Sequence, residues 1–158
     1  MIALPPDPPP IVGRATVIDG DTLEIRGQRI RIWGIDAPES RQTCQRAEQS
    51  YRCGRESALA LAAYIDRAGG TVTCIPRGRP DRYRRVVAMC DVRVRRPGGQ
   101  GTSNEDLGAQ QVQSGHALDY PRYSSGEYAG YELMARERRA GLWAGTFVMP
   151  WEWRGGRR

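Results

Sequence analysis

Three aspartates, a glutamate and an arginine lie in one short stretch of the sequence. Asp19, Asp21 and Asp36 carry hard oxygen donors, which are the ligands that a divalent cation prefers. Arg31 can stabilise a phosphate that gains negative charge, and Glu39 can orient or deprotonate a water molecule. A metal site, a phosphate-binding arginine and a candidate base in the same stretch indicate phosphodiester chemistry.

Alternation of apolar and polar residues predicts the strands that position these side chains. Strands are expected over residues 12–19, 22–26 and 29–35, with a tight turn before the third. In the third strand, isoleucines fill one face and arginines the other. Pro38 ends this strand, so the following glutamate is expected in a loop.

The rest of the chain predicts two more strands and three helices. After a polar loop that runs to Cys53, the expected elements are a helix over 55–68, strands over 71–76 and 86–94, a helix over 104–114 capped by Asn104, and a helix over 127–140. This order predicts an α+β fold that is mainly β: an OB-type, five-stranded β-barrel with three packed α-helices.

Length and composition predict one basic domain with extensions. The chain has 158 residues, no lysine and a formal net charge of +6, which favours a polyanionic partner, although a basic protein without a nucleic-acid role is the alternative. No apolar run is long enough to span a membrane. We expect a proline-rich arm (1–12), a main domain (13–143), and a tail (144–158) whose aromatic residues pack on the barrel and whose basic end (154–158) is disordered. The first residues do not read as a signal peptide, and a cleaved leader could precede them.

Four cysteines predict two disulfide bonds. Cys74 and Cys90 fall nearly opposite each other if the fourth and fifth strands pair antiparallel. Cys44 and Cys53 flank the polar loop, and a bridge between them would order it. These pairs favour a secreted or periplasmic protein, and four reduced thiols in a cytoplasmic protein are the alternative.

The order and spacing of these motifs resemble the thermonuclease family, also called staphylococcal-nuclease-like. The matching pieces are VIDGDT at 17–22, RIWGIDAPE at 31–39, GRESA at 54–58, DRYRRV at 81–86, GHALDY at 115–120 and ARERRAGLW at 135–143. The resemblance therefore covers roughly residues 13–143. It implies an OB-type barrel that cleaves DNA and RNA with one Ca²⁺.

The resemblance also implies roles for the acidic residues. Asp21 and Asp36 would be the carboxylate ligands of Ca²⁺, with Asp19 in the outer shell. The family usually has threonine where this chain has Ala37, so the backbone carbonyl ligand is kept and the hydroxyl is lost. Glu39 would hold or deprotonate the attacking water.

The remaining roles concern the phosphate and the nucleotide. Arg31 and Arg85 would bind the phosphate as its charge builds. The nucleotide contacts that the resemblance implies are Arg82, Tyr83 and Tyr123. Besides Ala37, three positions depart from the family: Arg82 replaces the usual lysine and keeps its charge, Arg84 replaces a common glycine, and Pro121 stands where a second tyrosine is expected, with Tyr120 beside it.

Together these features predict a monomeric, Ca²⁺-dependent nuclease of low sequence specificity. It would act on single-stranded or loosened DNA and RNA and leave 3′-phosphorylated products. The first alternative is a non-catalytic OB-fold module that binds nucleic acid. The second is a structural protein that uses the barrel to bind a protein partner.

Overall fold

A closed β-barrel forms the centre of the computed structural model, which describes residues 2–158. The main sheet has the order β3-β2-β1-β7-β8-β9, and a parallel pairing of β3 with β8 closes its first five strands. Its strands are β1 (Ile11–Asp19), β2 (Thr22–Ile25), β3 (Gln28–Ile32), β7 (Thr71–Pro76), β8 (Val86–Arg95) and β9 (Thr102–Asp106). The predicted five-stranded barrel is confirmed.

Strands β2 and β3 show why this sequence builds a barrel. Leu23 pairs with Ile30 across the two strands, and both side chains are fully buried in the core. The residues between the buried positions face outward because successive side chains in a strand point to opposite faces. Arg31 therefore stands on the outside of the barrel wall, between Ile30 and Ile32.

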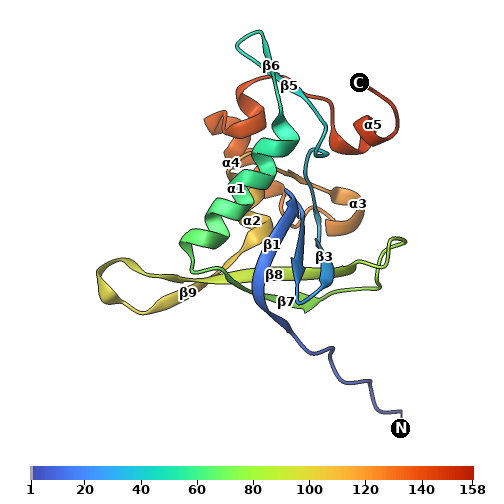
Figure 1. Ribbon diagram of the computed structural model, residues 1–158, viewed down its shortest axis with the longest axis vertical. Coiled ribbons are helices and arrows are strands. Elements are labelled where there is room, and N and C mark those ends of the chain that lie inside the picture. The colour runs from blue at the N-terminus through green and yellow to red at the C-terminus, as the bar shows by residue number, and fades with distance from the viewer. Residues whose placement is uncertain (1) are drawn as a thin grey trace.

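Helices cover the barrel and continue the chain beyond it (Figure 1). Helix α1 buries Leu61 and Ile65 in the barrel core. The helices are α1 (Cys53–Arg67), α2 (Leu107–Gln113), α3 (Pro121–Ser124), α4 (Ala129–Arg138) and α5 (Pro150–Arg154), with short 3₁₀ turns at Pro97–Gly99 and Gly141–Ala144. Across residues 2–158, no helix combines the length and the apolar character needed to cross a membrane.

The segment that begins at Asn104 was predicted as a helix and is instead the end of a strand. β9 pairs antiparallel with β8 from Thr102 opposite Arg95 to Asp106 opposite Asp91. Helix α2 starts only at Leu107, and its N-cap is Asp106, whose carboxylate accepts a hydrogen bond from the backbone N–H of Ala109 at 3.1 Å. The prediction failed because pairing with a long neighbouring strand outweighed the local capping signal.

A small hairpin replaces most of the polar loop predicted before Cys53. β5 (Cys44–Arg46) pairs with β6 (Gln49–Tyr51), and the two turn residues between them have positive φ angles. The predicted disulfide between Cys44 and Cys53 joins the start of this hairpin to the start of α1. Figure 1 shows the hairpin at the opposite end of the molecule from the N-terminal arm.

The second disulfide joins β7 to β8. Cys74 lies directly opposite Cys90 in the antiparallel register, and both residues are buried. Both predicted pairings are confirmed.

Replacing Cys74 and Cys90 by alanine should lower the free energy of unfolding by about 3 kcal/mol, because the unfolded chain regains the entropy of an open loop. Urea unfolding followed by circular dichroism measures the change. The Cys44→Ala, Cys53→Ala double variant is the comparison and should lose slightly less, since it opens a shorter loop, with a separation of 9 rather than 16 residues. An unchanged unfolding midpoint for the first variant would contradict this account.

The C-terminal segment packs on the hairpin side of the molecule. Phe147, Met149 and Trp151 lie against a buried cluster, separate from the barrel core, of Cys44, Cys53, Leu118 and Leu142. The aromatic residues therefore pack against the fold, but on this second cluster and not, as predicted, on the barrel. The prediction that residues 154–158 are all disordered was wrong, because Arg154 ends α5 and binds the site described below.

Candidate active site

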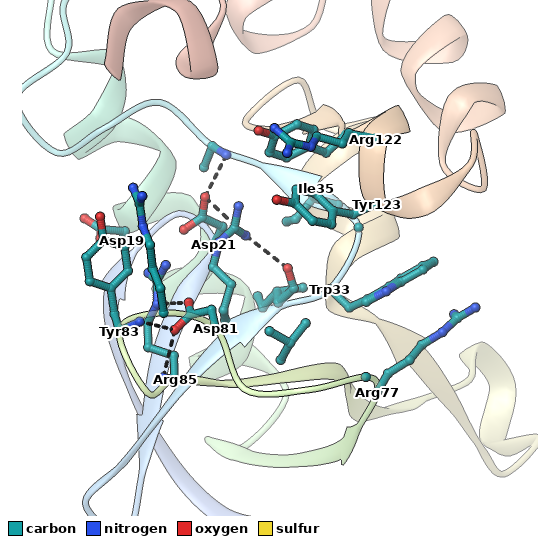
Figure 2. A pocket seen from close by; sticks show the side chains of 18 of the residues that line it. Asp19, Asp21, Trp33, Ile35, Arg77, Asp81, Tyr83, Arg85, Arg122 and Tyr123 are labelled. Atoms are coloured by element: carbon teal, nitrogen blue, oxygen red, sulfur yellow. Dashed lines mark hydrogen bonds and ion pairs between the residues drawn. The ribbon is translucent and has the colours of Figure 1, made fainter. Parts of the chain in front are cut away.

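One pocket gathers the acidic and basic residues of the sequence motifs. It has a volume of about 830 Å³ and lies between the β1–β2 turn, the segment 31–39, the loop 77–85 and the start of α3. Figure 2 shows Asp19, Asp21 and Arg85 toward one end of this pocket and Trp33 and Arg77 toward the other.

Asp36 is a fully buried carboxylate that lies behind the pocket and pairs with two of the arginines that line it. It belongs to β4 (Ile35–Asp36), which pairs with β10 (Leu118–Asp119), so backbone hydrogen bonds fix its position. Its side chain has no exposed surface. Burial raises the pKa of Asp36 to about 6; hydrogen bonds from Arg154 oppose this rise, and the charge of Asp21 adds to it.

Asp21 follows the Gly20 turn between β1 and β2. One carboxylate oxygen accepts a hydrogen bond from the backbone N–H of Ala37 at 2.8 Å, and the other accepts one from the Thr22 hydroxyl at 2.9 Å. The Gln111 amide donates to the carbonyl oxygen of Gly20 at 2.8 Å. A buried amide from α2 therefore supports the turn that carries Asp21.

Arg31 joins the two buried carboxylates. Its guanidinium nitrogens lie 3.5 Å from an oxygen of Asp21 and 3.3 Å from an oxygen of Asp36. Asp19 lines the same pocket; burial raises its pKa first, and the nearby charges of Asp21 and Glu39 raise it further. The turn and the strand thus bring several like charges together, with arginine between them.

The donor set suits a hard divalent cation. Asp21 and Asp36 are close enough for the Arg31 guanidinium to contact both, and the backbone of Ala37 lies next to Asp21. Their carboxylates supply oxygen ligands of the kind that Ca²⁺ binds. Among residues 2–158, no three His, Cys, Asp or Glu side chains approach closely enough to hold an ion by themselves. The Ala37 side chain is buried, and a Cβ added at Gly20 would lie 2.9 Å from it, so alanine fits a crowded position.

Glu39 lies on the loop after β4, at the entrance to the pocket. Its backbone N–H donates to the side-chain oxygen of Gln42 at 3.2 Å, and its own side chain is 34% exposed, so water can reach it. Gly54, in the first turn of α1, packs directly against this loop. A Cβ at Gly54 would overlap the carbonyl oxygen of Glu39, so the close approach of the helix requires glycine.

Asp81 positions Arg85. One oxygen of Asp81 accepts hydrogen bonds from the backbone N–H groups of Tyr83 and Arg85, each at 2.9 Å, and the other lies 2.6 Å from Nε of Arg85. Burial alone would raise the pKa of Asp81, but these hydrogen bonds and the charge of Arg85 hold it below its ordinary value. A second nitrogen of Arg85 donates to the Thr22 hydroxyl at 3.3 Å, which points the guanidinium toward Asp21.

If the pocket hydrolyses phosphodiesters, as the sequence predicts, Asp81→Ala should lower turnover of single-stranded DNA about tenfold, equivalent to about 1.4 kcal/mol of activation free energy, because Arg85 loses its fixed orientation. Steady-state kinetics measures the effect. If Asp81 acts through Arg85, adding Asp81→Ala to Arg85→Ala should cost little more activity. Fully additive losses would show that Asp81 acts independently.

Two exposed tyrosines and their neighbouring arginines line the pocket. Tyr83 is 64% exposed and Tyr123 57% exposed. The guanidinium of Arg82 lies 4.9 Å from the ring centre of Tyr83, and that of Arg122 lies 5.6 Å from the ring centre of Tyr123. These faces offer stacking and positive charge to a nucleotide strand.

The departures from the family pattern at Arg84 and Pro121 have structural consequences. Arg84 has a φ of +62°, in the left-handed region where glycine carries no steric cost. Tyr120, the neighbour of Pro121, stacks on Trp151 with ring centres 5.1 Å apart and meets Tyr123 edge-on at 4.9 Å. Tyr120 is therefore part of the packing that holds α5, while Tyr123 remains exposed.

The structure brings the sequence-predicted residues into one pocket and adds others. Gln111 and Arg154 were missed because they lie far along the chain from the carboxylate motifs and belong to no recognised pattern. Asp81 was present in a quoted motif, and its position four residues before Arg85 could have suggested an ion pair. The predicted residues that line the pocket are Asp19, Asp21, Arg31, Ala37, Glu39, Arg82, Tyr83, Arg85 and Tyr123; Asp36 lies buried behind it, paired with Arg31 and Arg154.

Residues 29–145 match the family model described as staphylococcal nuclease homologue. The chain is 40% identical over 135 residues to the succinoglycan biosynthesis protein ExoI of Rhizobium meliloti (strain 1021), with 85% of this chain and 65% of that protein covered. It is 32% identical over 146 residues to the micrococcal nuclease of Shigella flexneri, covering 87% of this chain and 76% of that protein. It is also 34% identical over 141 residues to the probable staphylococcal-like nuclease CAN4 of Oryza sativa subsp. japonica, covering 88% of this chain.

The chain spans just under two thirds of the rhizobial relative and 24% of the rice relative. These matches agree with the barrel and the pocket, and the chain belongs to the staphylococcal nuclease homologue family.

Proposed function

We propose that this protein is a Ca²⁺-dependent nuclease that hydrolyses DNA or RNA with low sequence specificity. One observation carries the proposal: Asp21, Arg31, Glu39 and Arg85 line one pocket with room for a nucleotide, and the buried Asp36 lies directly behind it, paired with Arg31. The exposed tyrosines of the same pocket support single-stranded or loosened substrates, because an unpaired base can stack on them. Relatives of this chain are named nucleases, in agreement with this activity.

Each side chain has a task in the proposed reaction. Asp21, Asp36 and the carbonyl of Ala37 would hold Ca²⁺, which supplies positive charge beside the phosphate when bound. Glu39 orients a water molecule and accepts its proton as the water oxygen forms a bond to phosphorus.

The phosphate and the leaving group complete the proposed step. Arg31 and Arg85 donate hydrogen bonds to the phosphate oxygens, where charge builds in the transition state. The bond between phosphorus and the 5′ oxygen breaks, and that oxygen takes a proton from solvent. The products are a 3′-phosphate on one strand end and a 5′-hydroxyl on the other.

Degradation of single-stranded DNA and of RNA tests the proposal. With Ca²⁺ present we expect both to be cut, and excess EGTA should abolish cleavage because the carboxylates then have no cation to hold. Treatment of the fragments with a phosphatase that removes 3′-phosphates, followed by mass spectrometry, identifies the ends. Intact substrate in Ca²⁺, together with retained binding, would favour the non-catalytic module instead.

We further propose that the protein works as a monomer in a secreted or periplasmic setting. The two disulfide bonds support an oxidising compartment. Sedimentation of the purified protein measures the oligomeric state, and alkylation of cells before lysis shows whether the cysteines are oxidised where the protein resides.

A further inference from the structure

A third arginine enters the pocket from the far end of the chain. The guanidinium of Arg154 places one nitrogen 2.9 Å from one oxygen of Asp36 and the other nitrogen 2.7 Å from the second oxygen. The first nitrogen also lies 2.8 Å from an oxygen of Glu39. The two terminal nitrogens of Arg154, called the fork below, therefore bind both a proposed Ca²⁺ ligand and the proposed base.

Packing of the C-terminal segment holds Arg154 in this place. The Gln42 amide donates to the carbonyl of Val148 at 2.7 Å, and Gln45 and Thr146 exchange two backbone hydrogen bonds of 2.9 and 3.0 Å. Trp151, which lies three residues before Arg154, stacks on Tyr120. These contacts hold helix α5 in place, and Arg154 is its last residue.

Charged donors contact both carboxylate oxygens of Asp36. Both oxygens of this buried carboxylate accept hydrogen bonds from Arg154, and one of them also accepts from Arg31. Burial would lower the pKa of the Arg154 guanidinium, but its hydrogen bonds to Asp36 and Glu39 raise it, so the side chain stays charged. Charged donors therefore occupy three of the roughly four acceptor sites of this carboxylate, and a cation on the remaining site of Asp36 would lie against the like charge of Arg154.

We infer that Arg154 is an intramolecular competitor of the divalent cation for Asp36 and Glu39. The inference rests on the proposed function, because it takes Asp36 as a cation ligand. With the cation absent, the single positive charge of Arg154 offsets part of the charge of the two carboxylates. A bound cation would be repelled by this guanidinium, so cation binding favours its departure from Asp36. The C-terminal segment thereby sets the cation affinity of the pocket, although residue 154 lies beyond the matched stretch 29–145.

Calorimetric titration of Ca²⁺ into the full chain, at fixed ionic strength, tests this role. Arg154→Met removes the charge and keeps most of the side-chain length, and it should bind Ca²⁺ roughly tenfold more tightly than the wild type. Arg157→Met is the matched control, because it removes the same charge from the same tail. Arg157 pairs with Glu152 at 3.0 Å and does not line the pocket, so its substitution should leave the affinity unchanged.

The outcomes separate this inference from the proposed function. Equal, measurable Ca²⁺ affinities for wild type and Arg154→Met overturn the competition and leave the proposed metal site standing. The absence of Ca²⁺ binding in all three proteins overturns the metal site and the competition together. Tighter binding in Arg157→Met as well would overturn the specific role, because loss of charge alone would then explain the gain.

Thermal unfolding gives a second readout that does not depend on activity. In EGTA, Arg154→Met should unfold at a lower temperature than the wild type, because Asp36 loses its main partner. Ca²⁺ should then raise its midpoint by more than it raises that of the wild type. If the methionine variant does not fold, Arg154→Lys keeps the charge without the fork and should bind Ca²⁺ more tightly than the wild type; wild-type affinity would overturn the inference.

Discussion

Glu39→Gln should lower the turnover number on single-stranded DNA by about 10²–10⁴-fold, the usual contribution of a positioned general base. Glutamine keeps the shape of the side chain but cannot accept a proton from water. The fold should be unaffected, since the Glu39 side chain is 34% exposed and makes its ion pair only at the pocket entrance. Single-turnover kinetics at saturating Ca²⁺ separates the chemical step from binding.

Glu56→Gln is the matched control for this experiment. Glu56 is also a glutamate near the hairpin, but it pairs with Arg46 in an exposed ion pair away from the pocket. Its activity should stay close to that of the wild type. Wild-type turnover in Glu39→Gln would remove Glu39 from the proposed mechanism.

Arg85→Ala should lower turnover by about 10²–10³-fold, because a donor aimed at developing charge is lost. The loss should fall on kcat more than on KM, because the phosphodiester, already an anion when bound, gains further negative charge in the transition state. Arg85 lies at the pocket surface, so the barrel core is not disturbed. Steady-state kinetics on a short oligonucleotide measures both constants.

Arg93→Ala serves as the comparison, because Arg93 is an exposed arginine on β8 outside the pocket. It removes the same charge and should leave kcat unchanged. If Arg85→Ala raised KM alone, Arg85 would contribute to substrate binding without favouring the transition state.

Much of the site could be predicted because its residues are close in sequence. Asp21 lies in the turn directly before β2, Arg31 lies on β3, and Asp36 follows on the short strand β4; apolar and polar residues alternate regularly in β2 and β3. That pattern predicts which side chains leave the barrel wall. The pairing of Cys74 with Cys90 could be predicted for the same reason, since two neighbouring strands fix the register.

The remaining features depend on long-range contacts that no local sequence pattern predicts. Helix α5 has five residues, too few for an apolar periodicity, and glycines follow it, so the segment resembles a free tail. Its position comes from packing on the hairpin cluster. The hairpin strands have three residues each, which is likewise too short for alternation to be recognised. Long-range packing decides both cases.

The contact between Gly54 and the carbonyl of Glu39 has a consequence for how this sequence can vary. Helix α1 could accept alanine at that position by its own preferences, since alanine is the better helix former. The loop forbids it, because any Cβ would push against the backbone that carries the proposed base. Gly54 does not line the pocket, yet it cannot be replaced unless the loop is rebuilt at the same time. The helix and the loop that carries Glu39 must therefore change together.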